Sequence, residues 1–150
     1  VQIARNRRRF AARAQLEFLA EDAGDWIKRN AQPGIAYFSY GGVFEYFTQE
    51  KFQDLLASIA DGPPVLLALV EPIGMDHDMD SAIASVPFGR EMSHSHAYPI
   101  LLEAAGFEIA WRQESTDQRS RWMMLVAQKR ASLVAACSSL LSPGLLSLLI

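Results

Sequence analysis

Histidine and acidic side chains gather in two stretches of the sequence, and together they could bind a metal ion. The residues are Asp76, His77, Asp78, Asp80, His94 and His96. Histidines two positions apart on an extended segment can share a face, and imidazole nitrogens and carboxylate oxygens are common zinc ligands. However, the stretch HSHAY lacks further ligands at a recognised spacing, and the acidic stretch lacks the central glycine of a calcium-binding loop. Metal binding is therefore an alternative, and we expect no metal here.

A second candidate site lies in the stretch YFSYGGVFEYF, residues 37–47. A continuous apolar run from Ile35 to Phe38 precedes Gly41 and Gly42, which is typical of a strand buried on both faces of a parallel sheet. In open sheets of this kind, ligands bind just beyond the carboxyl ends of the strands. Residues 40–46 are therefore predicted to form the floor of a binding site. The two glycines would allow close backbone approach, although a plain turn explains them equally well.

The elements that must position this site alternate between helix and strand patterns in the first half of the chain. We expect a helix over residues 2–15, a short strand over 16–20 and a helix over 26–29 that Asp25 caps. Thr48 is predicted to cap a further helix with one buried face. The residues of that face recur at helical spacing and are Phe52, Leu55, Leu56 and Ile59.

The second half of the chain continues the alternation and ends in a hairpin. The apolar run VLLALV (65–70) predicts a second central strand beside the one at Ile35, with the far ends of both strands facing one crevice. A long loop and a helix that starts at Pro99 follow. The last two strands, around 107–111 and 122–127, are joined by a short polar turn and should be antiparallel. Because the second arm is the more buried, we predict that it inserts between its partner and the strand at Val65.

Composition excludes some classes of protein and leaves others open. At 150 residues, 50% hydrophobic and 21% charged, the chain can form a globular domain, predicted over residues 1–130. The net charge of −3 argues against a general nucleic-acid binder. The arginines near the N-terminus suit a solvated helix face, with a phosphate or RNA patch as the alternative. They are Arg5, Arg7, Arg8, Arg9 and Arg13. The single Cys137 is compatible with a reducing compartment, so we expect a cytoplasmic protein.

The tail over residues 131–150 differs from the rest because it carries no charge. Twenty uncharged residues reach the length of a membrane span. Its serines and the central Pro143-Gly144 weaken that interpretation, so we expect a tail that packs on the domain or is irregular. Membrane contact through this tail is the alternative.

The order of these elements resembles the class I S-adenosylmethionine-dependent methyltransferases, over roughly residues 3–130. The stretch LEFLAEDAGDWI resembles the family's third strand and acidic turn, GIAYFSYGGVFEYF its fourth strand and loop, and VLLALVEP its fifth strand. The stretch SHSHAYPILLEAAGFEIAW resembles the helix that enters the sixth strand, and RWMMLVAQK the seventh. The resemblance implies a partial Rossmann-like, doubly wound α/β sheet that is mostly parallel, with helices on both faces.

The chain departs from the family in one respect, because the glycine-rich GxGxG turn and the acidic residue after strand two are absent. The family's strand order is 3-2-1-4-5-7-6, so the missing strands would lie between LEFLA and IAYFS. The resemblance is therefore to an N-terminally truncated fragment, and we expect very weak cofactor affinity and no activity from this chain alone. Without those strands, either LEFLA and IAYFS pair directly or an edge of the sheet is left uncovered, and an uncovered edge would make self-association an alternative.

The resemblance also implies roles for particular residues in binding S-adenosylmethionine. Asp22 would accept a hydrogen bond from the adenine amino group, with the Ala23 amide at the ring edge. Tyr40 and Gly41 fall where the family's fourth-strand loop lines the cofactor. The competing interpretation is that Asp22 and Asp25 only cap a helix.

Methyl transfer is an in-line displacement that depends on positioning, and it needs a base only when the acceptor must lose a proton. Glu45, His94 and His96 are the candidate bases, although each could be an ordinary surface or structural residue. The expected acceptor is a small molecule or a peptide side chain. The alternative function is a non-catalytic, methyltransferase-like binding module.

Overall fold

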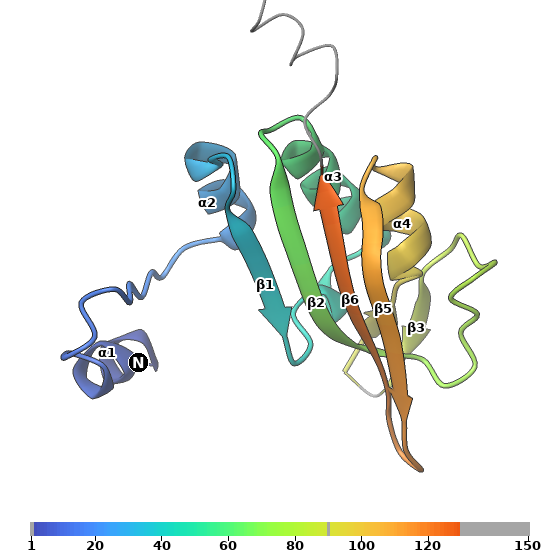
Figure 1. Ribbon diagram of the computed structural model, residues 1–150. Helices are drawn as coiled ribbons and strands as arrows, with labels where there is room; N and C mark the ends of the chain where they lie inside the picture. The colour runs from blue at the N-terminus through green and yellow to red at the C-terminus, as the bar shows by residue number, and fades with distance from the viewer. Residues whose placement is uncertain (1, 90, 130–150) are drawn as a thin grey trace, which may run out of the picture. The chain divides into compact units, whose positions relative to one another are not determined.

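The computed structural model describes residues 2–89 and 91–129 (Figure 1). The chain divides into two compact units, Val1–Asn30 and Ala31–Ile150, and each is described by itself. The first unit holds helices α1 (Gln2–Arg9) and α2 (Ala23–Asn30). The second unit holds the other helices and all the strands of the described residues.

The first unit corrects two sequence predictions. The helix expected over residues 2–15 ends at Arg9 and continues as turns, and the strand expected over residues 16–20 is absent from the described structure. Phe18 instead stacks on Phe10 with ring centroids 5.8 Å apart. Nε and Nη2 of the Arg7 guanidinium donate to the Phe18 carbonyl at 3.1 and 2.7 Å. The short apolar run is therefore used for a local contact, and its backbone has no neighbouring strand to pair with.

A four-stranded mixed sheet forms the centre of the second unit. Its strands are β1 (Ala36–Tyr40), β2 (Val65–Ile73), β5 (Glu108–Thr116) and β6 (Arg121–Lys129), in the order β1-β2-β6-β5. β1 and β2 are parallel, and β6 is antiparallel to both of its neighbours. The predicted insertion of the last strand between its hairpin partner and the strand at Val65 is confirmed. The predicted side-by-side, parallel arrangement of the strands at Ile35 and Val65 is also confirmed.

Two helices cover one side of this sheet. α3 (Gln49–Ala60) begins after Thr48, whose hydroxyl accepts a hydrogen bond from the Lys51 amide, so the predicted cap is confirmed. The predicted apolar face of α3 is buried. α4 (Tyr98–Ala104) carries Pro99 in its first turn, as expected. Figure 1 shows α3 and α4 behind the same face of the sheet, and the rings of Phe52 and Tyr98 meet at 5.5 Å.

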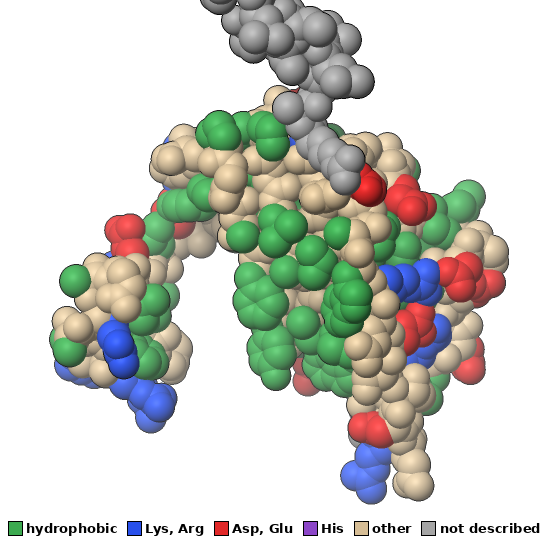
Figure 2. All heavy atoms as spheres, in the orientation of Figure 1, with side chains coloured by type: hydrophobic (Ala, Val, Ile, Leu, Met, Phe, Trp, Pro, Cys, Tyr) green, Lys and Arg blue, Asp and Glu red, His purple; other side chains and the backbone are tan. Residues whose placement is uncertain are grey.

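The opposite face of the sheet is open in the described structure, which contradicts the expected two-sided burial of the strand at Ile35. Phe38 and Tyr40 are 69% and 71% exposed, whereas Ser39 between them is buried. Leu66 and Trp111 lie on the same open face. Figure 2 shows hydrophobic side chains gathered over these strands. The reason is that α3 and α4 both lie on the other side of the sheet.

Shorter elements connect the sheet to the helices. The 3-10 helix η1 (Phe44–Tyr46) follows β1, and a two-stranded antiparallel sheet of β3 (Val86–Phe88) and β4 (Ser93–Ser95) occupies part of the long loop expected after β2. Among the described residues, none of the helices is both long and apolar enough to cross a membrane. The predictions for residues 131–150 lie outside the described residues.

Candidate functional site

The loop after β1 lies where the parallel strands β1 and β2 end at the same edge of the sheet. The Gly41 amide donates to the Val70 carbonyl at 3.0 Å, which continues the pairing of the two strands. Gly41 and Gly42 then adopt φ angles of +81° and +85°, a left-handed conformation that favours glycine. A Cβ atom on Gly42 would overlap the Glu45 carboxylate, whereas a Cβ on Gly41 would meet nothing within 4 Å. The loop therefore turns sharply into η1 and leaves open space beside Gly41.

Glu71 is the buried residue that holds this loop from β2. Its side chain is 0% exposed and accepts hydrogen bonds from the Val43 amide at 3.0 Å, the Phe44 amide at 3.1 Å and the Ser39 hydroxyl. Burial raises the pKa of Glu71, and this effect outweighs the three donors, which lower it. Glu71 was not among the residues predicted for the site. Its signal was a single carboxylate directly after the apolar run 65–70 and before Pro72.

His96 holds the same loop from the segment between β4 and α4. Its side chain is fully buried, and burial lowers its pKa, so the imidazole is neutral at pH 7. Nε2 lies 2.9 Å from the Phe44 carbonyl, and Nδ1 lies 2.6 Å from the Ser85 hydroxyl. Because a carbonyl only accepts, the network assigns the proton to Nε2, and Nδ1 accepts from Ser85. Action as a base would require His96 to give up one of these bonds.

Glu45 and His94, the other two candidate bases, lie on the neighbouring elements η1 and β4, which pack against each other. Glu45 is half-buried beside Gly42. The His94 ring is nearly parallel to that of His96, with centroids 6.1 Å apart. Within the described structure, His94 Nδ1 is buried and has no hydrogen-bond partner. The structure thus brings the segments of the three candidates together around the Phe44 carbonyl.

The expected cofactor residues lie in different units. Tyr40 and Gly41 are at the carboxyl end of β1, where the exposed Tyr40 ring stacks on Phe38 at 6.2 Å. Asp22 and Ala23 are in the first unit, at the start of α2. Asp22 Oδ1 accepts hydrogen bonds from the amides of Gly24 at 2.9 Å and Asp25 at 3.1 Å. Asp22 therefore caps the helix, and the prediction that Asp25 is the cap is wrong because the helix begins before it.

His77 and its acidic neighbours have separate structural partners. His77 Nδ1 lies 2.8 Å from the Ser95 hydroxyl, which also accepts from the Gly74 amide. Burial lowers the pKa of His77. Asp78 accepts hydrogen bonds from the amides of Asp80 and Ser81, and the Asp80 carboxylate pairs with an arginine of β5. Within residues 2–89 and 91–129, no three His, Cys, Asp or Glu side chains form a group that could hold a metal ion.

Arg121 fixes the loop after β2. Its Nη1 donates to the carbonyls of Gly74, Met75 and His77 at 3.3, 3.3 and 2.7 Å. Its other donors bind the Glu114 carboxylate at 3.0 and 2.6 Å. Burial acts to raise the pKa of Glu114, but hydrogen bonds from Arg112 and Arg121 outweigh it, and that pKa is lowered. The two loops at the shared edge of the sheet are thus each held by a charged side chain.

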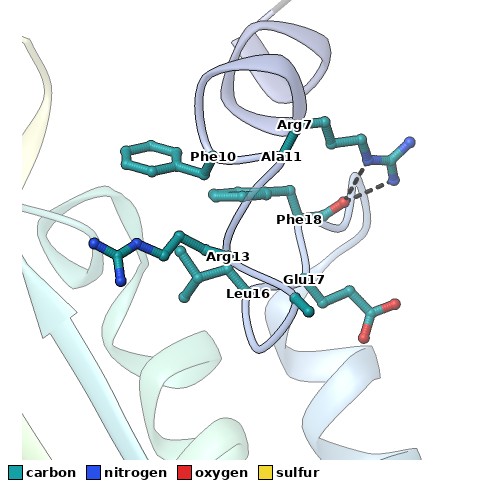
Figure 3. Close-up of a pocket in the computed structure, with 8 residues that line it drawn as sticks. Arg7, Phe10, Ala11, Arg13, Leu16, Glu17 and Phe18 are labelled. Carbon is teal, nitrogen blue, oxygen red and sulfur yellow. Dashed lines mark hydrogen bonds between the residues drawn. The ribbon is translucent and has the colours of Figure 1, made fainter.

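The first unit contains a shallow pocket of about 380 Å³ (Figure 3). The stacked rings of Phe10 and Phe18 line it, and the side chains of Arg7 and Arg13 point to opposite sides of it. The Arg7 guanidinium is occupied by the Phe18 carbonyl. The expectation that the N-terminal arginines form a solvated face, with a phosphate patch as the alternative, stays a prediction.

Comparison with known proteins identifies no family for this chain. No protein-family model matches the sequence, and no curated protein matches it.

Proposed function

We propose that this chain is part of a class I S-adenosylmethionine-dependent methyltransferase that acts on a small molecule or a peptide side chain. The observation that carries the proposal is the strand order β1-β2-β6-β5, in which only β6 runs against the others. In the family that the sequence resembles, strands four, five, seven and six follow in this order, and the seventh is the inserted one.

The open parts of the sheet also support this proposal. In the family's order, strand one pairs with strand four, the position of β1, which is the end strand of the four described here. The exposed face that carries Phe38 and Tyr40 is where further helices of a doubly wound Rossmann-like sheet would pack. Support is confined to residues 36–129, because residues 16–20 do not form the strand that the resemblance implied.

The loop after β1 is suited to binding S-adenosylmethionine in this proposal. The space beside Gly41 and its left-handed backbone allow a ligand to approach the main chain closely. Tyr40 would line the cofactor. When bound, the cofactor supplies the methyl group. The chain itself would orient the acceptor and exclude water, and Glu45, His94 or His96 would take a proton only from an acceptor that must lose one. With a single cysteine, we place the protein in the cytoplasm.

Titration calorimetry with S-adenosylmethionine tests this proposal. The natural full-length protein should bind with a dissociation constant in the micromolar range, whereas residues 1–150 alone should bind very weakly. Gly41→Val should weaken binding about tenfold, equivalent to about 1.4 kcal/mol. Gly106→Val is a matched control, because Gly106 also has a left-handed backbone and no atom within 4 Å of an added Cβ. A full-length protein that does not bind S-adenosylmethionine would contradict the proposal.

A non-catalytic binding module is the second candidate, and the exposed apolar face of β1 favours it. Such a face can be covered by a partner protein or a second copy of the chain. Sedimentation velocity over a range of concentrations distinguishes the two candidates when combined with the titration. A protein that self-associates and ignores S-adenosylmethionine fits the module, and a monomer that binds the cofactor fits the enzyme.

A further inference from the structure

We propose that Glu71, assisted by His96, is a positioning residue that fixes the loop Gly41–Phe44 and thereby the placement of Gly41 and Glu45. This inference rests on the proposed function, because the loop matters for chemistry only if it lines a cofactor and acceptor site. Glu71 is completely buried and binds the backbone of the loop, so it would act through the loop.

The peptide groups of Phe44 are held from two directions. The Phe44 amide donates to Glu71 at 3.1 Å, and the Phe44 carbonyl accepts from His96 at 2.9 Å. The adjacent Val43 amide also donates to Glu71, at 3.0 Å. Glu71 comes from β2, and His96 precedes α4. Two elements that are distant in the sequence therefore fix one short stretch of backbone.

The loop needs such external contacts because its other backbone bonds are few: the Gly41 amide donates to the Val70 carbonyl at 3.0 Å, and the Phe47 amide donates to the Phe44 carbonyl at 2.9 Å. Gly41 and Gly42 have no side chains to restrict the backbone, and glycine has access to many more backbone conformations than other residues. A side chain at Gly41 would have no neighbour within 4 Å, so packing does not hold that position either. The bonds to Glu71 and His96 supply the missing restriction.

Core packing alone does not account for a carboxylate at position 71. Its partners are three neutral donors, from Ser39, Val43 and Phe44, and it is completely buried. Removing a carboxylate from water is costly, and an apolar residue of similar volume often serves a core as well or better. The contribution that only an acceptor can make at this position is to hold the two loop amides.

Two substitutions separate the hydrogen bonds from the shape of the side chain. Glu71→Leu removes every acceptor. Glu71→Gln keeps a carbonyl oxygen for the amides of Val43 and Phe44 and can donate its amide group to the Ser39 hydroxyl oxygen. Glu114→Gln is the matched control, because Glu114 is a carboxylate of the same sheet that binds arginines away from this loop. If Glu71→Leu does not fold, His96→Leu keeps the Glu71 bonds, removes the bonds to the Phe44 carbonyl and the Ser85 hydroxyl, and tests the same restriction from the other side.

The experiment measures amide hydrogen exchange by NMR and S-adenosylmethionine binding by calorimetry on the natural full-length protein. Glu71→Leu should accelerate exchange at Val43 and Phe44 by about tenfold or more, with the amides of Leu67 and Leu125 as core references. It should also weaken cofactor binding about tenfold. Glu71→Gln and Glu114→Gln should leave both quantities within about threefold of wild type. A purely structural role would lower the melting temperature without changing the affinity of the folded protein.

Each contrary result has a distinct meaning. Unchanged exchange at Val43 and Phe44 in Glu71→Leu would overturn the inference. Accelerated exchange with unchanged cofactor affinity would also overturn it, while the proposed function would stand. A wild-type protein that does not bind S-adenosylmethionine would overturn the proposed function, and with it any role of Glu71 in placing a cofactor, even if the exchange result were as expected.

Discussion

The loops after β1 and β2 lie at the same edge of the sheet and are held by opposite charges. Glu71 accepts hydrogen bonds from the amides of the first loop. Arg121 donates hydrogen bonds to the carbonyls of the second, at Gly74, Met75 and His77. Each charged group therefore binds backbone groups of the opposite polarity, and each loop is held in part by a side chain from a strand of the sheet.

The two charges differ in how they are compensated. Arg121 is half-buried and pairs with Glu114, which also binds Arg112, so the second loop is held by a charge network at the surface. Glu71 is completely buried and has only neutral donors as partners. The consequence is visible in the carboxylates, because the pKa of Glu71 is raised and that of Glu114 is lowered. The first loop is thus attached through a group that is costly to bury and the second through one that is not.

The largest effect is expected when the Glu71 carboxylate, which binds the first loop, is removed. Glu71→Ala leaves the amides of Val43 and Phe44 without an acceptor and opens a cavity, so we expect it to lower the free energy of unfolding by about 3 kcal/mol. Urea denaturation measures this change. A loss below about 1 kcal/mol would mean that water or a neighbouring group replaces the carboxylate at little cost.

A smaller effect is expected from the glycines of the first loop. Gly42→Ala strains a left-handed backbone and also displaces the Glu45 carboxylate, which is the far end of a flexible side chain, so we expect a loss of about 1.5 kcal/mol. Gly41→Ala is the matched control, with the same kind of backbone strain and free space, and should cost about 1 kcal/mol. Equal losses in thermal denaturation would show that contact with Glu45 does not matter.

Removing the Arg121 side chain should lower the free energy of unfolding by less than removing the Glu71 side chain. Arg121→Ala loses the bonds to the loop after β2, but Arg121 is only half-buried and Glu114 keeps Arg112 as a partner. We expect a loss of about 1 kcal/mol in urea denaturation. A loss larger than that of Glu71→Ala would reverse the comparison between the two loops.

The smallest effects are expected in the pH dependence of stability, where the two carboxylates should act with opposite sign. The folded protein binds the Glu71 proton more tightly than the unfolded chain, so this contribution to stability decreases as pH rises from the usual value of 4.5 through the raised pKa. Glu114 has a lowered pKa, so its contribution is complete above 4.5 and is lost as pH falls through the lowered value.

Unfolding free energies measured from pH 3 to pH 8 would separate these two contributions. The difference between wild type and Glu71→Gln should decrease with rising pH, and the difference between wild type and Glu114→Gln should increase with it. If both differences changed in the same direction with pH, Glu71 would not be the carboxylate with a raised pKa and Glu114 the one with a lowered pKa.

Local sequence patterns predicted the parts of this fold that depend on periodicity. The face of α3 from Phe52 to Ile59 follows from its spacing, and the insertion of β6 follows from the contrast between the half-apolar arm at 107–111 and the fully apolar arm at 122–127. The burial of β1 was predicted wrongly because the run from Ile35 to Phe38 does not reveal whether a helix lies on both sides of the strand. The run at 16–20 looked like a strand only in composition.

The candidate site was predictable only in outline. The glycines and the parallel strand ends identified the loop after β1. The hydrogen bonds of Glu71 to this loop could not be predicted. Glu71 follows Val43 by 28 residues and Ser39 by 32, and backbone amides leave no signal in the sequence. His96 was singled out for its chemistry, but its two hydrogen bonds depend on a carbonyl and a serine that only the tertiary structure brings near.

The position of β6 also has a consequence for synthesis on the ribosome. Among the described residues, β6 is the last strand to be translated, yet it joins β2 to β5 in the middle of the sheet. Until its residues emerge, the nascent chain can pair β1 with β2, but β5 has no strand beside it and the edge of β2 that pairs with β6 stays open. We therefore expect ribosome-bound chains arrested before Arg121 to be protease-sensitive from β5 onwards, and the sheet to close in a single late step.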